Sequence, residues 1–157
     1  MRDMPESHYR KLDDLQQVVT YRLARLQARL NSQAGRRLKS CTELSLTQWR
    51  LVAAMQRLGQ TTLAEISHAT QIDKGQLSRA ISALLDAGLI ASEADRTDNR
   101  KHLLSLTEAG LREHEAIEPV MRDRSSALVA DFDEAELAAF FRSLDKIDAA
   151  VKRQDGA

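Results

Sequence analysis

The chain has 157 residues, of which 43% are hydrophobic and 29% are charged, and its formal net charge is zero. This length is typical of one domain, and no apolar run reaches the roughly 18 residues that a membrane span needs. The start of the chain lacks the apolar core of a signal peptide, and a single cysteine, Cys41, cannot form an internal disulfide. We therefore expect a cytoplasmic, mainly α-helical protein with one domain over residues 1–157 and no membrane partner.

The neutral total hides an uneven distribution of charge along the chain. Residues 1–40 contain nine Lys and Arg against four Asp and Glu, a net +5, whereas residues 107–157 contain seven basic and twelve acidic residues, a net −5. Overall charge is thus uninformative about the partner, and any attraction to nucleic acid must come from the placement of individual cations.

Near the N-terminus, apolar residues recur at steps of three and four over residues 9–32, which predicts an amphipathic helix. The stripe consists of Leu12, Leu15, Val19, Leu23, Leu26 and Leu30. A polar connection over residues 33–43 follows, in which Arg36, Arg37 and Lys39 precede Cys41. Nearby cations favour the reactive thiolate, which makes Cys41 a candidate oxidant sensor. The basic run itself is either a solvated loop or a phosphate clamp.

The next helix is predicted from Thr47 to about Leu58, and Gly59 ends it. Its inward positions are expected to be Leu51, Val52, Met55 and Leu58. Trp49, the only tryptophan, lies in its first turn beside Arg50.

Two further helices follow, each with its start marked by a capping residue. Thr62 and Glu65 form a Thr-x-x-Glu capping box, which opens the first of them. After a short turn, Asp73 is expected to cap the second, with Gln76 as its reciprocal partner, and Gly88 to end it in a left-handed conformation.

The second of these helices has two distinct faces. Its apolar stripe is predicted to pack on the preceding helix and consists of Leu77, Ile81, Leu84 and Leu85. The opposite face carries Gly75, Arg79, Ser82 and Asp86, with Gln76 and Ser78 on its flanks and Lys74 at its start. Gln and Arg can make bidentate contacts to adenine and guanine edges. This face is therefore either a surface that reads DNA bases or an ordinary solvated face.

Two short strands are predicted next, over residues 89–93 and 101–106, around a polar tip at residues 95–100. The tip and its edge carry Arg96, Asp98, Arg100 and Lys101. An arginine gains from the negative potential of a narrow minor groove. Asp98 either forms the turn through its own backbone or orients the guanidinium of Arg100. A helix that fits the major groove, followed by a basic hairpin, predicts a winged helix-turn-helix over residues 47–106.

A long helix is predicted from its N-cap Thr107 to about Ala130, bent but not stopped by Pro119. A second capping box, Asp133 with Glu136, opens a C-terminal helix. Residues 9–32 and 107–152 are thus expected to supply helices for dimerisation, because two reading helices need a spacer to reach two half-sites. The alternative is that they complete the core of a monomer. The expected interface consists of Leu12, Leu15, Val19, Leu137, Phe140, Phe141, Leu144 and Ile147.

Residues 44–110 resemble the MarR family of bacterial transcriptional regulators. The resemblance rests on Leu46-Thr-Gln-Trp-Arg50, Asp73-Lys-Gly-Gln-Leu-Ser-Arg79, Leu84-Leu-Asp-Ala-Gly-Leu-Ile90, the Asp98-Asn-Arg100 wing and the Leu106-Thr-Glu-Ala-Gly110 exit. It implies a homodimer that binds pseudo-palindromic double-stranded operators and is often released by small phenolic or carboxylic compounds. By the same resemblance, Arg100 enters the minor groove, Asp98 orients it and Arg96 makes a second contact.

The resemblance also implies an effector site at the junction of the first helix, the Trp49 helix and the Pro119 helix. There Trp49 can stack on an aromatic ligand and Arg22, Arg25 or Arg50 can bind a carboxylate. The alternative role of Trp49 is that of a core residue.

No motif of an enzyme is present, and the four histidines share no ligand spacing. We therefore expect no catalytic residues, no metal and no cofactor. The remaining alternatives are a regulator controlled by oxidation of Cys41 and a winged-helix module for protein–protein contact. In sum, the sequence predicts a DNA-binding regulator, most simply a repressor that a small molecule releases.

Overall fold

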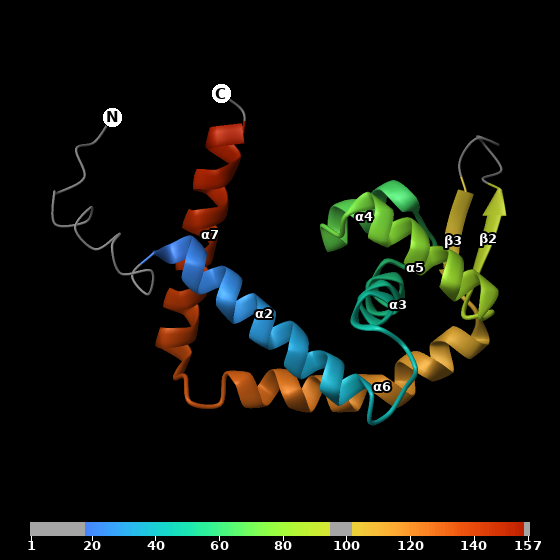
Figure 1. Ribbon diagram of the computed structural model, residues 1–157, viewed down its shortest axis with the longest axis horizontal. Coiled ribbons are helices and arrows are strands. Elements are labelled where there is room, and N and C mark those ends of the chain that lie inside the picture. Colours follow the sequence, from blue (N-terminus) through green and yellow to red (C-terminus); the bar gives the residue numbers. More distant parts are fainter. Residues whose placement is uncertain (1–17, 95–101, 156–157) are drawn as a thin grey trace, which may run out of the picture. The chain divides into compact units, whose positions relative to one another are not determined.

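The computed structural model describes residues 18–94 and 102–155. The chain is divided into two compact units, residues 1–121 and residues 122–157, with the boundary inside helix α6. The elements are α2 (Val19–Leu38), α3 (Leu46–Leu58), β1 (Thr61–Thr62), α4 (Leu63–Thr70), α5 (Lys74–Asp86), β2 (Ile90–Ala94), β3 (His102–Leu106), α6 (Glu108–Leu128) and α7 (Glu134–Asp155) (Figure 1). This confirms the predicted fold class, which is mainly α with a winged helix-turn-helix. No helix of the described part is long and apolar enough to cross a membrane.

The three strands form one antiparallel sheet in the order β1-β3-β2. Thr61 pairs with Leu104, and the hairpin register runs from Ile90 opposite Leu106 to Ala94 opposite His102. Strand β1, with only two residues, was not predicted, because it forms by pairing with β3 rather than from a local pattern. The first predicted strand began one residue early, since Leu89 N–H instead donates to Leu84 O at 3.0 Å and closes the end of α5.

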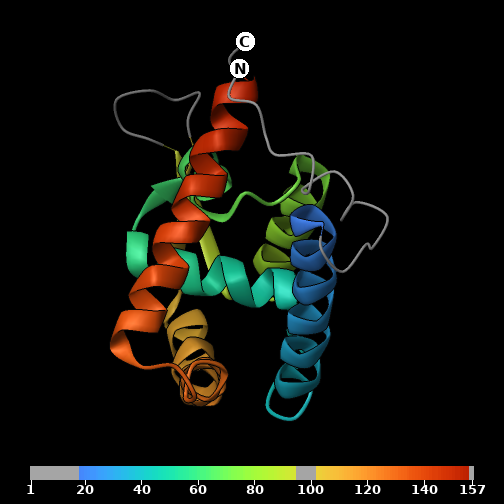
Figure 2. The same ribbon diagram turned by 90° about the vertical axis from the view of Figure 1, so that its left-hand side faces the viewer.

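Helix α3 lies at the centre of the first unit, where it packs against α2, α4, α5 and β3. Figure 2 shows the ribbon from the side, with α3 running across the direction of α2. Trp49, Leu51, Val52 and Met55 of α3 are all buried in the core. The prediction that Leu58 faces inward is wrong: it is 45% exposed, because it is the last residue of the helix and the chain turns away at Gly59.

Helix α2 extends to Leu38, beyond the predicted end at residue 32. Ala34 and Leu38 follow Leu30 at four-residue steps and are both buried, so packing against the core continues the helix into a segment that looked like a polar connection. The earlier part of the predicted helix, with Leu12 and Leu15, lies outside the described residues.

The predicted helix boundaries are mostly confirmed by their caps. Thr62 and Glu65 form both bonds of the capping box before α4, and Gly88 follows α5 with φ +68°. Helix α3 begins one residue earlier than predicted because Ser45, together with Gln48, forms a further capping box.

Helix α6 begins after Thr107, whose hydroxyl accepts from Gly110 N–H at 3.1 Å, and it continues through Pro119 without a stop, as predicted. Gly110 lies against the chain that leaves α5. A Cβ added there would lie 2.0 Å from the carbonyl oxygen of Leu89. The helix can therefore approach the start of β2 only because residue 110 has no side chain.

The second unit contains α7, which opens with the predicted Asp133 and Glu136 capping box. None of residues 134–154 of α7 is buried. Several of its large apolar side chains are strongly exposed: Phe140 at 40%, Phe141 at 53%, Ile147 at 37% and Val151 at 50%. Near its end, Asp148 lies 2.7 Å from Lys152 and raises the pKa of that exposed amine.

Candidate nucleic-acid interface

Helix α5 is the second helix of the helix-turn-helix. The Asp73 carboxylate caps it by accepting from the backbone N–H groups of Gly75 and Gln76, at 3.0 and 3.1 Å. The expected reciprocal bond from the Gln76 side chain to Asp73 is not formed, so that part of the prediction is wrong. The Gln76 side chain is instead exposed at the surface, where it can contact a ligand.

The two faces of α5 differ sharply in burial. Its buried residues are Leu77, Ala80, Ile81 and Leu84. Leu85, predicted to belong to this stripe, is 38% exposed. Leu85 lies at the edge of the buried stripe. Helix α5 packs against α3, and the small side chain of Ala80 is buried in its place. The residues of α5 that are expected to contact DNA are all exposed: Lys74, Gln76, Ser78, Arg79 and Ser82.

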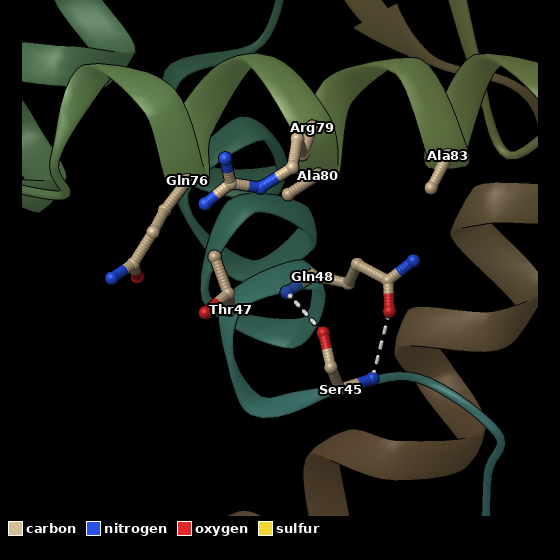
Figure 3. Close-up of a pocket in the computed structure, with 7 residues that line it drawn as sticks. All are labelled: Ser45, Thr47, Gln48, Gln76, Arg79, Ala80 and Ala83. Atoms are coloured by element: carbon tan, nitrogen blue, oxygen red, sulfur yellow. Dashed lines mark hydrogen bonds between the residues drawn. The ribbon is translucent and has the colours of Figure 1, made fainter.

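A shallow open groove of about 280 Å³ lies between α5 and the first turn of α3. Figure 3 shows Gln76 and Arg79 of α5 on one side of it and Thr47 and Gln48 of α3 on the other. Its lining residues are Ser45, Thr47, Gln48, Gln76, Arg79, Ala80 and Ala83. The α3 residues were not predicted to lie at the interface. The Ser45-x-x-Gln48 pattern could have indicated an exposed helix start, but only the packing of α3 on α5 places it beside Arg79.

The β2–β3 hairpin follows α5 directly, in the position of a wing (Figure 1). Its strands are paired up to Ala94 and His102, and residues 95–101 are the segment of the sequence between them. Arg96, Asp98, Arg100 and Lys101 lie in this segment, outside the described residues. Their roles in DNA binding stay predictions.

The residues expected to bind an effector lie on α2 and α3. Trp49 is only 7% exposed and stacks on His114 of α6, with ring centroids 5.4 Å apart and planes 20° apart. Arg50 is exposed and donates from Nη2 to Asn31 Oδ1 of α2 at 2.7 Å. Arg22 and Arg25 are exposed on α2. Trp49 is thus a core residue in this structure, the alternative that the sequence left open.

A second hollow, of about 640 Å³, lies beside the connection between α2 and α3. Cys41 and Glu113 are among its lining residues, whereas the four expected effector residues are not. The Cys41 thiol is exposed and lies 3.5 Å from the carbonyl oxygen of Leu38. Among residues 18–94 and 102–155, no three His, Cys, Asp or Glu side chains gather where they could hold a metal ion.

Comparison with known proteins identifies the same module. The sequence model of the MarR family matches residues 42–101. The HTH-type transcriptional repressor IacR of Pseudomonas putida is 24% identical over 81% of this chain and 75% of its own length. An uncharacterised HTH-type transcriptional regulator of Staphylococcus aureus is 36% identical over 48% of this chain, a match that spans half of that relative.

Two solved structures resemble the chain over most of its length. A MarR/EmrR family transcriptional regulator from Acinetobacter is 22% identical, with a TM-score of 0.83 and coverage of 89% of this chain and 99% of the other. A structure on the regulation of DNA binding of Bordetella bronchiseptica BpsR by 6-hydroxynicotinic acid is 25% identical, with a TM-score of 0.75 and coverage of 83% and 92%.

A helix-turn-helix whose second helix has an exposed polar face, followed by a β-hairpin, is the architecture of winged-helix DNA-binding proteins. The order and spacing of the elements and the comparisons agree on one group of such proteins. Residues 42–101 form the DNA-binding module of a MarR-family transcriptional regulator, and the chain as a whole resembles regulators of that family in sequence and fold.

Proposed function

We propose that the protein is a homodimeric repressor that binds a pseudo-palindromic operator and is released from it by a small aromatic or carboxylic effector. The observation that carries the DNA-binding part is the exposed face of α5. There Lys74, Gln76 and Arg79 stand opposite a fully apolar buried stripe and beside a hairpin. The alternative is that the polar face of α5 is merely solvated, and that alternative does not account for a hairpin directly after the helix.

The proposed dimer is supported by the apolar side chains of α7 and by charge. The side chains of Phe140, Phe141 and Val151 are between 40% and 53% exposed in the single chain. Large apolar side chains that gather on a surface are typical of a site where a partner covers them. The net charges of +5 and −5 on residues 1–40 and 107–157 favour contacts between unlike ends of two copies. A twofold axis would also place two α5 helices on two half-sites.

The proposed effector site is supported by the hydrogen bond between Arg50 and Asn31, which joins α3 to α2. A ligand carboxylate can replace the Asn31 oxygen on the guanidinium with a stronger, charge-assisted bond, and α2 and α3 would then separate. The DNA binding of BpsR, which this chain resembles, is regulated by 6-hydroxynicotinic acid, an aromatic carboxylic acid.

The DNA-binding proposal is tested by selecting bound fragments from a random double-stranded DNA library with the purified full-length protein. The wild type is expected to select a palindromic motif. Arg79→Ala is expected to lose preference for one base pair in each half-site by about tenfold or more, because a bidentate Arg contact contributes about 1–3 kcal/mol to discrimination. Selection of no motif by the wild type would refute the proposal.

The effector proposal is tested by the fluorescence of Trp49, the only tryptophan in the chain. Small aromatic carboxylates are screened for release of the operator. A compound that releases it is expected to change Trp49 emission, because α3 carries both Trp49 and Arg50, and to bind at least about tenfold more weakly to Arg50→Ala, which loses a charge-assisted bond.

A releasing compound that leaves Trp49 emission and the Arg50→Ala variant unaffected would place the effector site elsewhere. Release by peroxide, lost in Cys41→Ser, would instead establish control by oxidation of the exposed thiol.

A further inference from the structure

Gly75, in the first turn of α5, lies one helical turn before Arg79. A Cβ built on Gly75 would lie 3.6 Å from Arg79 Nη1 and 3.2 Å from Asp73 Oδ1. The Arg79 guanidinium is therefore folded back over the glycine. Figure 3 shows the Arg79 side chain running along α5 toward Gln76 rather than away from the helix.

This conformation depends on the space above the Gly75 Cα atom. Side chains four residues apart on a helix lie one above the other. A Cβ at residue 75 would be in van der Waals contact with the guanidinium, at 3.6 Å from Nη1, and tight against Asp73 Oδ1, at 3.2 Å. A β-branched side chain would extend further and would force the guanidinium away from the N-terminal end of α5.

We propose that Gly75 is a positioning residue for Arg79 in DNA recognition. Its missing side chain lets the Arg79 guanidinium lie beside Gln76, so that the two side chains meet neighbouring base pairs at the N-terminal end of α5. The inference rests on the proposed function, since it assumes that Arg79 reads a base. It also explains why a glycine is present in the first turn of a helix, where it weakens the helix relative to alanine.

A different explanation for the glycine is close approach of the α5 backbone to DNA. The two explanations make different predictions when Arg79 is absent. If Gly75 acts through Arg79, a side chain at residue 75 has no effect on an Arg79→Ala protein. If Gly75 admits the DNA backbone, the side chain weakens binding equally in both backgrounds.

The experiment compares Gly75→Ala and Gly75→Val, each with and without Arg79→Ala, as full-length proteins in the random-library selection. We expect the base preference that Arg79 supplies to fall in the order wild type, Ala, Val, with Val approaching the roughly tenfold or greater loss of Arg79→Ala. In the Arg79→Ala background, both substitutions are expected to leave the selected motif and the affinity unchanged.

Thermal unfolding separates this effect from misfolding. Gly75→Ala is expected to leave the melting temperature nearly unchanged, because the gain in helix propensity offsets the small shift that the Cβ forces on the Asp73 carboxylate. The matched control is Gly35→Ala in α2, where an added Cβ meets nothing within 4 Å. It is expected to raise the melting temperature by about 2–4 °C without changing the motif.

Equal losses from Gly75→Val in both backgrounds would overturn the inference in favour of backbone approach. An unchanged motif in both Gly75 variants, with Arg79→Ala still losing its base pair, would overturn it while leaving the proposed function intact. If the wild type selects no motif, the proposed function fails and the inference falls with it.

Discussion

The affinity of the full-length protein for its operator is expected to fall by about 10³–10⁵ when the salt concentration rises from 50 to 200 mM. Binding of about 6–10 phosphates by a dimer releases as many condensed counterions, and added salt opposes that release. The overall charge of zero makes this a sharp prediction, because the effect must come from local cations such as Lys74 on α5 and those predicted at the wing. The measurement is a fluorescence anisotropy titration at several salt concentrations.

Lys74→Ala is expected to weaken binding uniformly across sequences and to reduce the salt slope by about one for each protomer. The control is Arg153→Ala, an exposed cation in the last turn of α7, which should leave the slope unchanged. An affinity that does not depend on salt would exclude phosphate contacts and would favour the alternative of a winged-helix module for protein–protein contact.

Phe141→Asp is expected to weaken dimerisation by at least about thirtyfold and to remove binding of the full palindrome at concentrations where the wild type is saturated. Phe141 is 53% exposed in the single chain, so a partner can bury it. Truncation of a central interface residue typically weakens binding by about 2 kcal/mol, and burial of an unpaired carboxylate at the same place costs more. Light scattering at low micromolar concentration should show a mass of 17.6 kDa for the variant and twice that for the wild type.

The matched control is Ala139→Asp, which adds the same charge two residues before Phe141, on the face of α7 opposite to the apolar stripe. Ala139 is exposed, and it stands neither three nor four residues from any residue of the expected interface on α7. This variant is expected to stay dimeric. A Phe141→Asp protein that kept the mass of two chains and the affinity of the wild type would refute the predicted interface.

The described part of the fold was largely predictable from local sequence signals. Capping boxes act over three residues, so the starts of α4 and α7 could be read from Thr62 with Glu65 and from Asp133 with Glu136. Glycine after a helix acts over a single residue, which is why the end of α5 at Gly88 was also correct. For the same reason, the exposed reading face of α5 followed from the 3.6-residue period alone.

The candidate site was predictable only in part, because a groove needs two elements. Periodicity identified Gln76 and Arg79, but it contained nothing about Thr47 and Gln48, which reach the same groove because α3 packs against α5. The space that Gly75 leaves for Arg79 likewise depends on where the side chain folds in three dimensions.

The sequence by itself determined the kinds of element, most of their ends and the residues on the exposed polar face of α5, since each depends on interactions within about one helical turn. Tertiary structure decided the pairing of β1 with β3, the extension of α2 to Leu38 and the exposure of Leu58 and Leu85. It also explains Gly110, where the Leu89 carbonyl leaves no room for a Cβ. The physical reason is that pairing, burial and close approach depend on neighbours that are distant in the chain and have no local signature.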